Sequence, residues 1–153
     1  MPERKLVIVS ASSSIRKEPD EAIPAIERYD GIYFRVLRKY LYERKRKNID
    51  VLIVSEKLGL IWSHDKISYH EPHAGKWGSL SLDKNTVRKL RTQNLEKLRR
   101  IVNQYSEIYV NVGLKYMKLI EGFEKIATCK VTYATGKGLG PKAVHMKQWL
   151  ISQ

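Results

Sequence analysis

Polar residues able to bind anions follow each of four short apolar runs in this chain, which has 153 residues. Glycines allow backbone N–H groups to approach an anion closely, while lysines add positive charge. If the runs are parallel strands, the residues after them meet at one edge of the sheet, where such sheets bind ligands. This predicts one pocket for a phosphate or a nucleotide-like ligand. The residues in question are Ser10, Ser12, Arg16 and Lys17; Ser55, Glu56, Lys57 and Gly59; Asn111, Gly113 and Lys115; and Thr135, Gly136, Lys137, Gly138, Gly140 and Lys142. The alternative is that turns are rich in serine and glycine for their own reasons.

The segment 135–142 is a candidate anion site in its own right. Its glycines are placed between a strand and a helix, and Pro141 suits the first turn of that helix. Lys137 and Lys142 bring charge, and the helix dipole adds its positive end. The G-x-x-x-x-G-K-[ST] spacing of a Walker A loop is missing. A plain tight turn with solvated lysines is the alternative.

Two carboxylates, Asp30 and Glu56, are the candidates for acid/base or nucleophilic chemistry if the chain is an enzyme. Carboxylates at such positions more often cap a helix or pair with a basic residue, and Asp30 is placed to cap a helical pattern. We predict no metal site, because His64, His70 and His73 are polar loop residues and the only cysteine is Cys129. The sequence identifies no cofactor.

The elements that carry these residues alternate between buried strands and amphipathic helices. The apolar runs predict strands over 5–10, 50–55, 107–112 and 129–134. Helical spacing of apolar residues predicts helices over 31–47, 83–104, 113–123 and 142–151, with Asp83 as the cap of the second. The connection 56–82 reads as irregular. Together they predict a single α/β domain over 1–153: three layers, with a mainly parallel sheet of about four strands and helices on both faces.

The charge balance favours a polyanionic partner. The chain carries 29 Lys and Arg against 16 Asp and Glu, a formal net charge of +13. Such a field attracts nucleic acid, although a generally charged surface of the thermophile kind is the alternative. No apolar run reaches the length of about 18 residues that a membrane span needs, and the start lacks the pattern of a secretory signal. We therefore expect a cytoplasmic protein without a membrane partner.

Several short segments carry a family resemblance. They are Pro24, Ala25 and Ile26 with Tyr29, Asp30, Gly31 and Tyr33; the run 53–60; Asp65, Ile67 and Tyr69; and Gly138, Gly140, Trp149 and Leu150 near the end. The first three resemble the peroxide-stress protein YaaA family and also small uncharacterised microbial α/β domains related to it in pattern. The last resembles the end of those small domains, a glycine-rich turn followed by a helix that closes in Trp-Leu. This chain is shorter than a typical YaaA protein.

The resemblance implies oxidative-stress protection and DNA binding in a positively charged cleft. By position, that cleft would be lined by Ser10, Ser12, Lys17, Tyr29, Asp30, Ser55, Lys57 and Gly59. The small relatives often have cysteine near the end of the first strand; serines stand there in this chain, which argues against a thiol mechanism.

The composition, the strand-end residues and the resemblance together predict a nucleic-acid-binding domain. DNA is the preferred partner over RNA, the cleft receives a phosphate or an extruded base, and the setting is stress response or repair. An enzyme acting on a nucleobase or a nucleotide is the first alternative, and it would take a nucleotide-like small molecule. A scaffold or interaction protein is the second.

Overall fold

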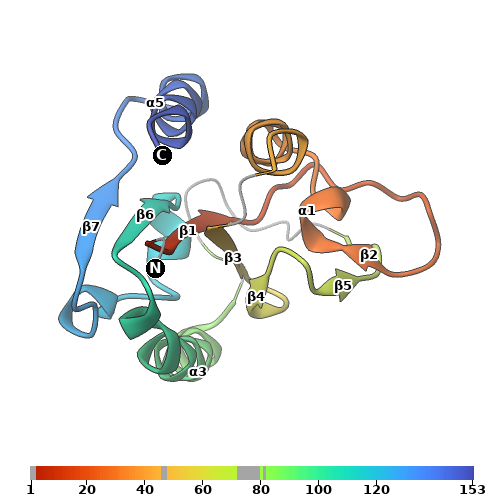
Figure 1. Cartoon of the computed structure of the whole chain (residues 1–153). Coiled ribbons are helices and arrows are strands. Elements are labelled where there is room, and N and C mark those ends of the chain that lie inside the picture. Colours follow the sequence, from red (N-terminus) through yellow and green to blue (C-terminus); the bar gives the residue numbers. More distant parts are fainter. Residues whose placement is uncertain (1–2, 46–47, 72–79, 81) are drawn as a thin grey trace.

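The main sheet of the computed structural model, which describes residues 3–45, 48–71, 80 and 82–153, has the strand order β4-β3-β1-β6-β7 (Figure 1). The parallel strands are β1 (Lys5–Ser10), β3 (Ile49–Ser55), β6 (Glu107–Asn111) and β7 (Lys130–Tyr133). Their positions confirm the strands predicted from the apolar runs. The expected α/β class with a mainly parallel sheet is therefore correct.

Of the connection 56–82, residues 72–79 and 81 lie outside the described residues, and the part 56–71 is more regular than expected. The edge strand β4 (Gly59–Trp62) pairs antiparallel with β3, so the sheet has five strands instead of about four. A second, two-stranded antiparallel sheet joins β2 (Ile23–Pro24) to β5 (Lys66–Ile67). The β3–β4 hairpin forms because Ser55 Oγ accepts hydrogen bonds from the N–H groups of Lys57 and Leu58, at 3.1 and 3.0 Å. Gly59 then takes a left-handed φ of 77°, which closes the turn.

Helices pack on both faces of the main sheet because successive strand residues point to opposite sides. On one face, Val7, Val9 and Ile53 pack in a core with α1 (Ala25–Arg28), α2 (Ile32–Leu37), the π-helical η1 (Arg38–Glu43) and α5 (Leu139–Ile151). On the other, Leu6 and Ile8 pack with α3 (Lys84–Ile101), the 3-10 turns η2 (Val102–Gln104) and η3 (Phe123–Lys125), and residues next to and within α4 (Leu114–Met117). Figure 1 shows α3 and α5 on opposite sides of the strands. None of the helices formed by the described residues is long and apolar enough to cross a membrane.

Three helix predictions need correction. The helix expected over 113–123 ends at Met117, because side chains of α3 donate hydrogen bonds to the next two backbone carbonyls. Arg91 Nε donates to Lys118 O at 2.8 Å, and Asn94 Nδ2 donates to Leu119 O at 2.9 Å. The last helix begins at Leu139 instead of residue 142. The helix expected over 31–47 is capped by Gly31, not by Asp30, and changes from α to π geometry at Arg38.

Candidate functional site

The three central strands end in buried polar side chains. Ser10 ends β1, Ser55 ends β3 and Asn111 ends β6, and each is at most 8% exposed. The strand order places β1 between β3 and β6, so the chain leaves β1 toward β3 and leaves β6 toward β7. In parallel sheets, the crevice at such a point of divergence is where ligands bind. The predicted meeting of strand-end residues therefore occurs for these three strands.

Hydrogen bonds hold the loops that leave these strands. Ser10 Oγ accepts from the N–H of Gly113 at 3.2 Å, which ties the end of β1 to the start of α4. Ser12 Oγ accepts from the N–H of Gly31 at 3.1 Å, and a Cβ on Gly31 would come within 2.7 Å of the Ser12 Cβ. This close approach requires glycine at position 31. Both serines therefore position the backbone at the edge of the site.

Two tyrosines from the first helical segment reach the same edge. Tyr29 is fully buried, its hydroxyl lies 3.4 Å from His70 Nε2, and the Ser55 side chain is near enough to act on its pKa against the effect of burial. The Asn111 side chain acts on the pKa of Tyr33 in the same way, while its Nδ2 donates to Met146 Sδ at 3.6 Å. Burial raises the pKa of both tyrosines above the ordinary value, so both hydroxyls stay protonated at neutral pH and can donate hydrogen bonds.

A buried charge completes the arrangement. The side chain of Glu56 is 1% exposed, and its Oε1 lies 3.7 Å from Lys115 Nζ on α4. Lys115 also lies over the ring of Tyr116, at 4.9 Å from the centroid. Burial, followed by the negative charge of Glu56, raises the pKa of Tyr116 to about 12. We call these residues the strand-end cluster: Ser10, Tyr29, Tyr33, Ser55, Glu56, Asn111, Lys115 and Tyr116.

Asp30 has a different environment from Glu56. Its carboxylate is 2.6 Å from Arg38, 3.4 Å from Arg16 and 3.5 Å from Arg35. Burial acts to raise the pKa of Asp30, but the hydrogen bonds from Arg38 and Arg35 and the charge of Arg16 outweigh it and lower the pKa. Arg38 also donates to the carbonyls of Ile26 and Tyr29. Asp30 is therefore an ionised structural partner that holds the segment carrying Tyr29.

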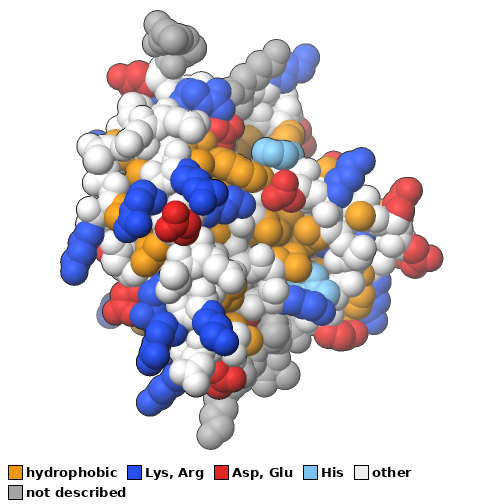
Figure 2. Space-filling view, turned by 90° about the horizontal axis from the view of Figure 1, so that it is seen from below, with side chains coloured by type: hydrophobic (Ala, Val, Ile, Leu, Met, Phe, Trp, Pro, Cys, Tyr) orange, Lys and Arg blue, Asp and Glu red, His pale blue; other side chains and the backbone are white. Residues whose placement is uncertain are grey.

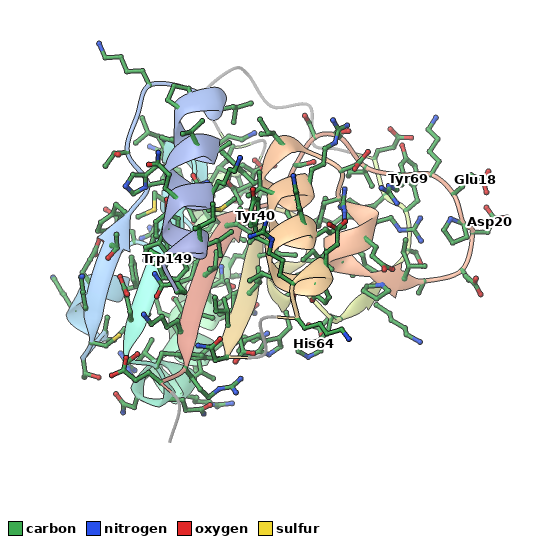
Figure 3. The ribbon with its side chains drawn as sticks, turned by 45° about the horizontal axis from the view of Figure 1, so that its top comes forward. Glu18, Asp20, Tyr40, His64, Tyr69 and Trp149 are labelled. Atoms are coloured by element: carbon green, nitrogen blue, oxygen red, sulfur yellow. The ribbon has the colours of Figure 1, made fainter. Side chains whose placement is uncertain are left out.

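Lys17 lies beside the β2–β5 sheet. Its Nζ is 5.9 Å from the centroid of the Tyr69 ring, and Glu18 and Asp20 follow it in the chain. Figure 3 shows Glu18 and Asp20 projecting outward on the side of the molecule away from α5, where the labelled Trp149 lies. The structure does not bring Lys17 among the side chains that hydrogen-bond at the strand ends. Lys57, by contrast, is exposed at the tip of the β3–β4 hairpin, next to Glu56.

The glycine-rich turn is exposed and follows an edge strand. Gly136 and Gly138 have left-handed φ values of 124° and 85°, and a Cβ on Gly136 would come within 2.5 Å of the Pro141 Cβ. Because α5 begins at Leu139, Pro141 occupies the third helical position. Proline has no backbone N–H group, so this position cannot donate a hydrogen bond to an anion. β7 is only partly buried, although a buried strand was expected before this turn. Among the residues that the structure describes, no hydrogen bond links the side chain of Lys137 or Lys142 to the strand-end cluster.

The histidines lie apart in the described part of the chain. His70 is next to Tyr29, whereas His64 stacks on Trp62 with 5.9 Å between ring centroids. His73 is outside the described residues. No group of three His, Cys, Asp or Glu residues able to hold a metal occurs among the residues that the structure describes.

Sequence reasoning marked some members of the strand-end cluster and missed others. Asn111 and Lys115 were named only because they come after the third predicted strand, and no role was assigned to them. Tyr33 belongs to a segment of the family resemblance but received no role in the cleft, and Tyr116 carried no signal, because aromatic residues at helical spacing usually belong to the core. Only the packing of α2 and α4 against the strand ends brings these hydroxyls to the site.

The fold and this site define an α/β domain with a polar cluster at the carboxyl ends of its parallel strands. The crystal structure of AF0587, a protein of unknown function, is similar over 97% of this chain and 45% of that chain, with a TM-score of 0.55 and 14% sequence identity. The likeness concerns the fold alone, and this chain spans less than half the length of that protein. No family model and no curated protein matches the chain.

Proposed function

We propose that this three-layer α/β domain binds nucleic acid, with DNA as the preferred partner, and that the strand-end cluster receives a phosphate or an extruded base. The carrying observation is the cluster itself. Buried hydroxyl, amide and carboxylate groups at the ends of three adjacent strands, with the Lys115 ammonium group beside them, offer the donors, acceptors and positive charge that a base edge or a phosphate needs. A role in stress response or repair is part of this proposal.

The charge supports the same proposal. Proteins that bind nucleic acid without much sequence preference combine a basic surface with aromatic rings. Here the net charge is +13, and the acidic residues Glu18, Asp20 and Glu21 belong to the loop beside Lys17. Figure 2 shows Lys and Arg side chains gathered over one half of the face seen from the α3 side, with hydrophobic side chains between them. The cytoplasm is the compartment that we propose for this activity.

Binding to a labelled DNA oligonucleotide is expected to be strongly salt-dependent. If four phosphates are contacted, the association constant should fall on the order of 100-fold between about 50 and 200 mM salt, because binding releases condensed counterions. Lys57→Gln should weaken binding and reduce the slope by about one counterion. Fluorescence anisotropy measures both quantities.

The matched control is Lys125→Gln, which removes another exposed lysine from a turn, on η3. It should leave the affinity within about twofold of the wild type at fixed salt, since a distant exposed charge contributes little. Absence of binding at low salt by folded protein would contradict the proposal. Equal losses of affinity in Lys57→Gln and Lys125→Gln would show that Lys57 makes no specific phosphate contact.

The burial of Glu56 favours an enzyme acting on a nucleobase or a nucleotide as the second candidate function. If Glu56 transfers a proton or acts as nucleophile, Glu56→Gln should reduce turnover about 10³-fold and leave substrate affinity nearly unchanged. The first measurement is a screen of nucleosides, nucleotides and oligonucleotides with modified bases for product formation. No turnover in that screen would leave the binding function as the better account.

Asp30→Asn is the comparison variant for this test. Because Asp30 is ion-paired with three arginines, the change should lower the melting temperature by several degrees, about 1–2 kcal/mol, while the folded fraction keeps its turnover. Loss of turnover in folded Asp30→Asn would assign the chemistry to Asp30 instead.

A further inference from the structure

A pocket of about 400 Å³ lies beside the N-terminal half of α3, separate from the strand-end cluster. Its described lining is apolar on one part and cationic on the other. The apolar residues are Leu80, Leu82 and Val87, and the cationic residues are Lys84, Arg88, Arg91 and Lys118. No carboxylate belongs to this described lining. We call it the α3 pocket.

The helix dipole opposes this gathering of positive charge. Lys84 occupies the first position of α3, Arg88 follows one turn later, and the first turn contains no acidic residue. The N-terminus of a helix carries partial positive charge, so cations there are unfavourable and anions are favourable. Asp83 supplies one negative charge, but it accepts a hydrogen bond from the Thr86 N–H as the helix cap. An anion in the α3 pocket would relieve the repulsion among the four cations.

One of the four cations is already held in place. Arg91 Nε donates to the Lys118 carbonyl at 2.8 Å, and its Nη1 lies 3.8 Å from Glu121 Oε2. These contacts orient the guanidinium before any ligand arrives, so less side-chain freedom is lost when an anion binds. They also join α3 to the turn after α4, which carries Lys118. Glu121 is mostly exposed, at 70%, and it reduces the local charge only in part.

We propose that the α3 pocket binds the phosphate group of a phosphorylated ligand. An oriented guanidinium with ammonium groups around it suits phosphate oxygens, and the apolar part of the lining suits the body of a nucleotide. The phosphate belongs either to a nucleic-acid backbone or to a free nucleotide. The first source rests on the proposed function. In that case one nucleic-acid strand would contact both sites along α4 and the turn after it, because Lys115 on α4 belongs to the strand-end cluster and Lys118 on that turn lines the α3 pocket.

The test compares two double variants that remove the same charge. Arg88→Gln with Lys118→Gln removes two cations of the α3 pocket, and Arg99→Gln with Arg100→Gln removes two exposed cations from the far half of α3. The probes are inorganic pyrophosphate, ATP and a single-stranded 12-mer, titrated by calorimetry, with melting temperatures measured to confirm folding. The pocket variant should bind pyrophosphate at least about 10-fold more weakly, and the control should stay within about twofold.

Each outcome either supports or overturns phosphate binding at the α3 pocket. Equal losses in the two double variants, or no binding of any probe by the wild type, would overturn the pocket. Selective loss of ATP alone supports the pocket and identifies a free nucleotide as the source, while selective loss of the 12-mer supports it with nucleic acid as the source. Wild-type binding of pyrophosphate without binding of any oligonucleotide would support the pocket and contradict the proposed function.

Discussion

Replacing Arg28 by methionine is expected to lower the melting temperature by about 10 °C, which corresponds to about 3 kcal/mol in a chain of this length. Arg28 is fully buried, and its guanidinium donates to four backbone carbonyls of the described residues. They are Ile67 O at 3.2 Å, Arg16 O and Pro19 O at 3.0 Å, and Glu21 O at 2.7 Å. Methionine fills similar volume but removes every donor, so these carbonyls lose their partners.

The loss of stability should be largest in the loop 16–21 and at β5, since the Arg28 side chain donates hydrogen bonds to backbone carbonyls of both segments. Amide hydrogen exchange should accelerate there more than in β1 or β3. Arg28→Lys should recover less than half of the loss, because one ammonium group cannot span carbonyls that a planar fork reaches. Arg99→Met, at a side chain that is 64% exposed, is the control and should change stability by less than about 0.5 kcal/mol. A wild-type melting temperature for Arg28→Lys would contradict this account.

Replacing Glu107 by glutamine is expected to reduce the free energy of unfolding by about 2 kcal/mol at pH 7. Glu107 begins β6, and its side chain is 11% exposed. Its Oε2 accepts from Thr132 Oγ1 at 2.6 Å and from Trp149 Nε1 at 3.1 Å, while Oε1 lies 3.5 Å from Lys5 Nζ. One carboxylate thus joins β1, β6, β7 and α5, so losing its charge weakens contacts among four elements.

This loss should depend on pH in a definite direction. Burial acts to raise the pKa of Glu107, but hydrogen bonds from Thr132 and Trp149 and the charges of Lys130 and Lys5 outweigh it and lower the pKa. A carboxyl whose pKa is lower in the folded state stabilises the protein above its unfolded pKa of about 4.3, and that stabilisation disappears as the pH falls through the folded pKa. The difference between wild type and Glu107→Gln should therefore be full at pH 7 and shrink progressively below about pH 4.

Urea unfolding at pH 7, 5, 4 and 3 measures this difference directly. Glu96→Gln is the control, because Glu96 is exposed on α3 and its pairs with Arg99 and Arg100 are 3.9 and 3.7 Å long. Its effect should stay below about 0.5 kcal/mol at every pH. A constant difference between wild type and Glu107→Gln from pH 7 to pH 3 would show that the charge of Glu107 does not contribute.

Local sequence signals predicted the main strands and the long helix for identifiable reasons. The buried strands are continuous runs of β-branched and aliphatic residues, which suit positions covered on both faces. Asp83 caps α3 as predicted, through a 2.8 Å hydrogen bond from the Thr86 N–H. The helical stripe through Val87 and Leu98 packs in the core as expected. These features need only neighbours in the chain.

The misassigned segments depend on partners that are distant in the chain. Strands β2 and β5 have two residues each, too short for a period, and they pair across more than 40 positions. The helix after Gly113 stops early because side chains of α3 take two of its carbonyls. The role of Asp30 was likewise undecided in the sequence, since Arg38 and Arg16 approach it only in the fold.

The sequence by itself determined the class of fold, the edge of the sheet where polar residues gather and the basic character of the surface. Which of those residues act together was decided by the tertiary structure alone. Packing brings Tyr29 to Ser55, Tyr33 to Asn111 and Lys115 to Glu56, while leaving Lys17 beside Tyr69. The physical reason is range: strand and cap formation follow from local chain chemistry, whereas a site requires side chains from separate elements to meet within a few ångströms.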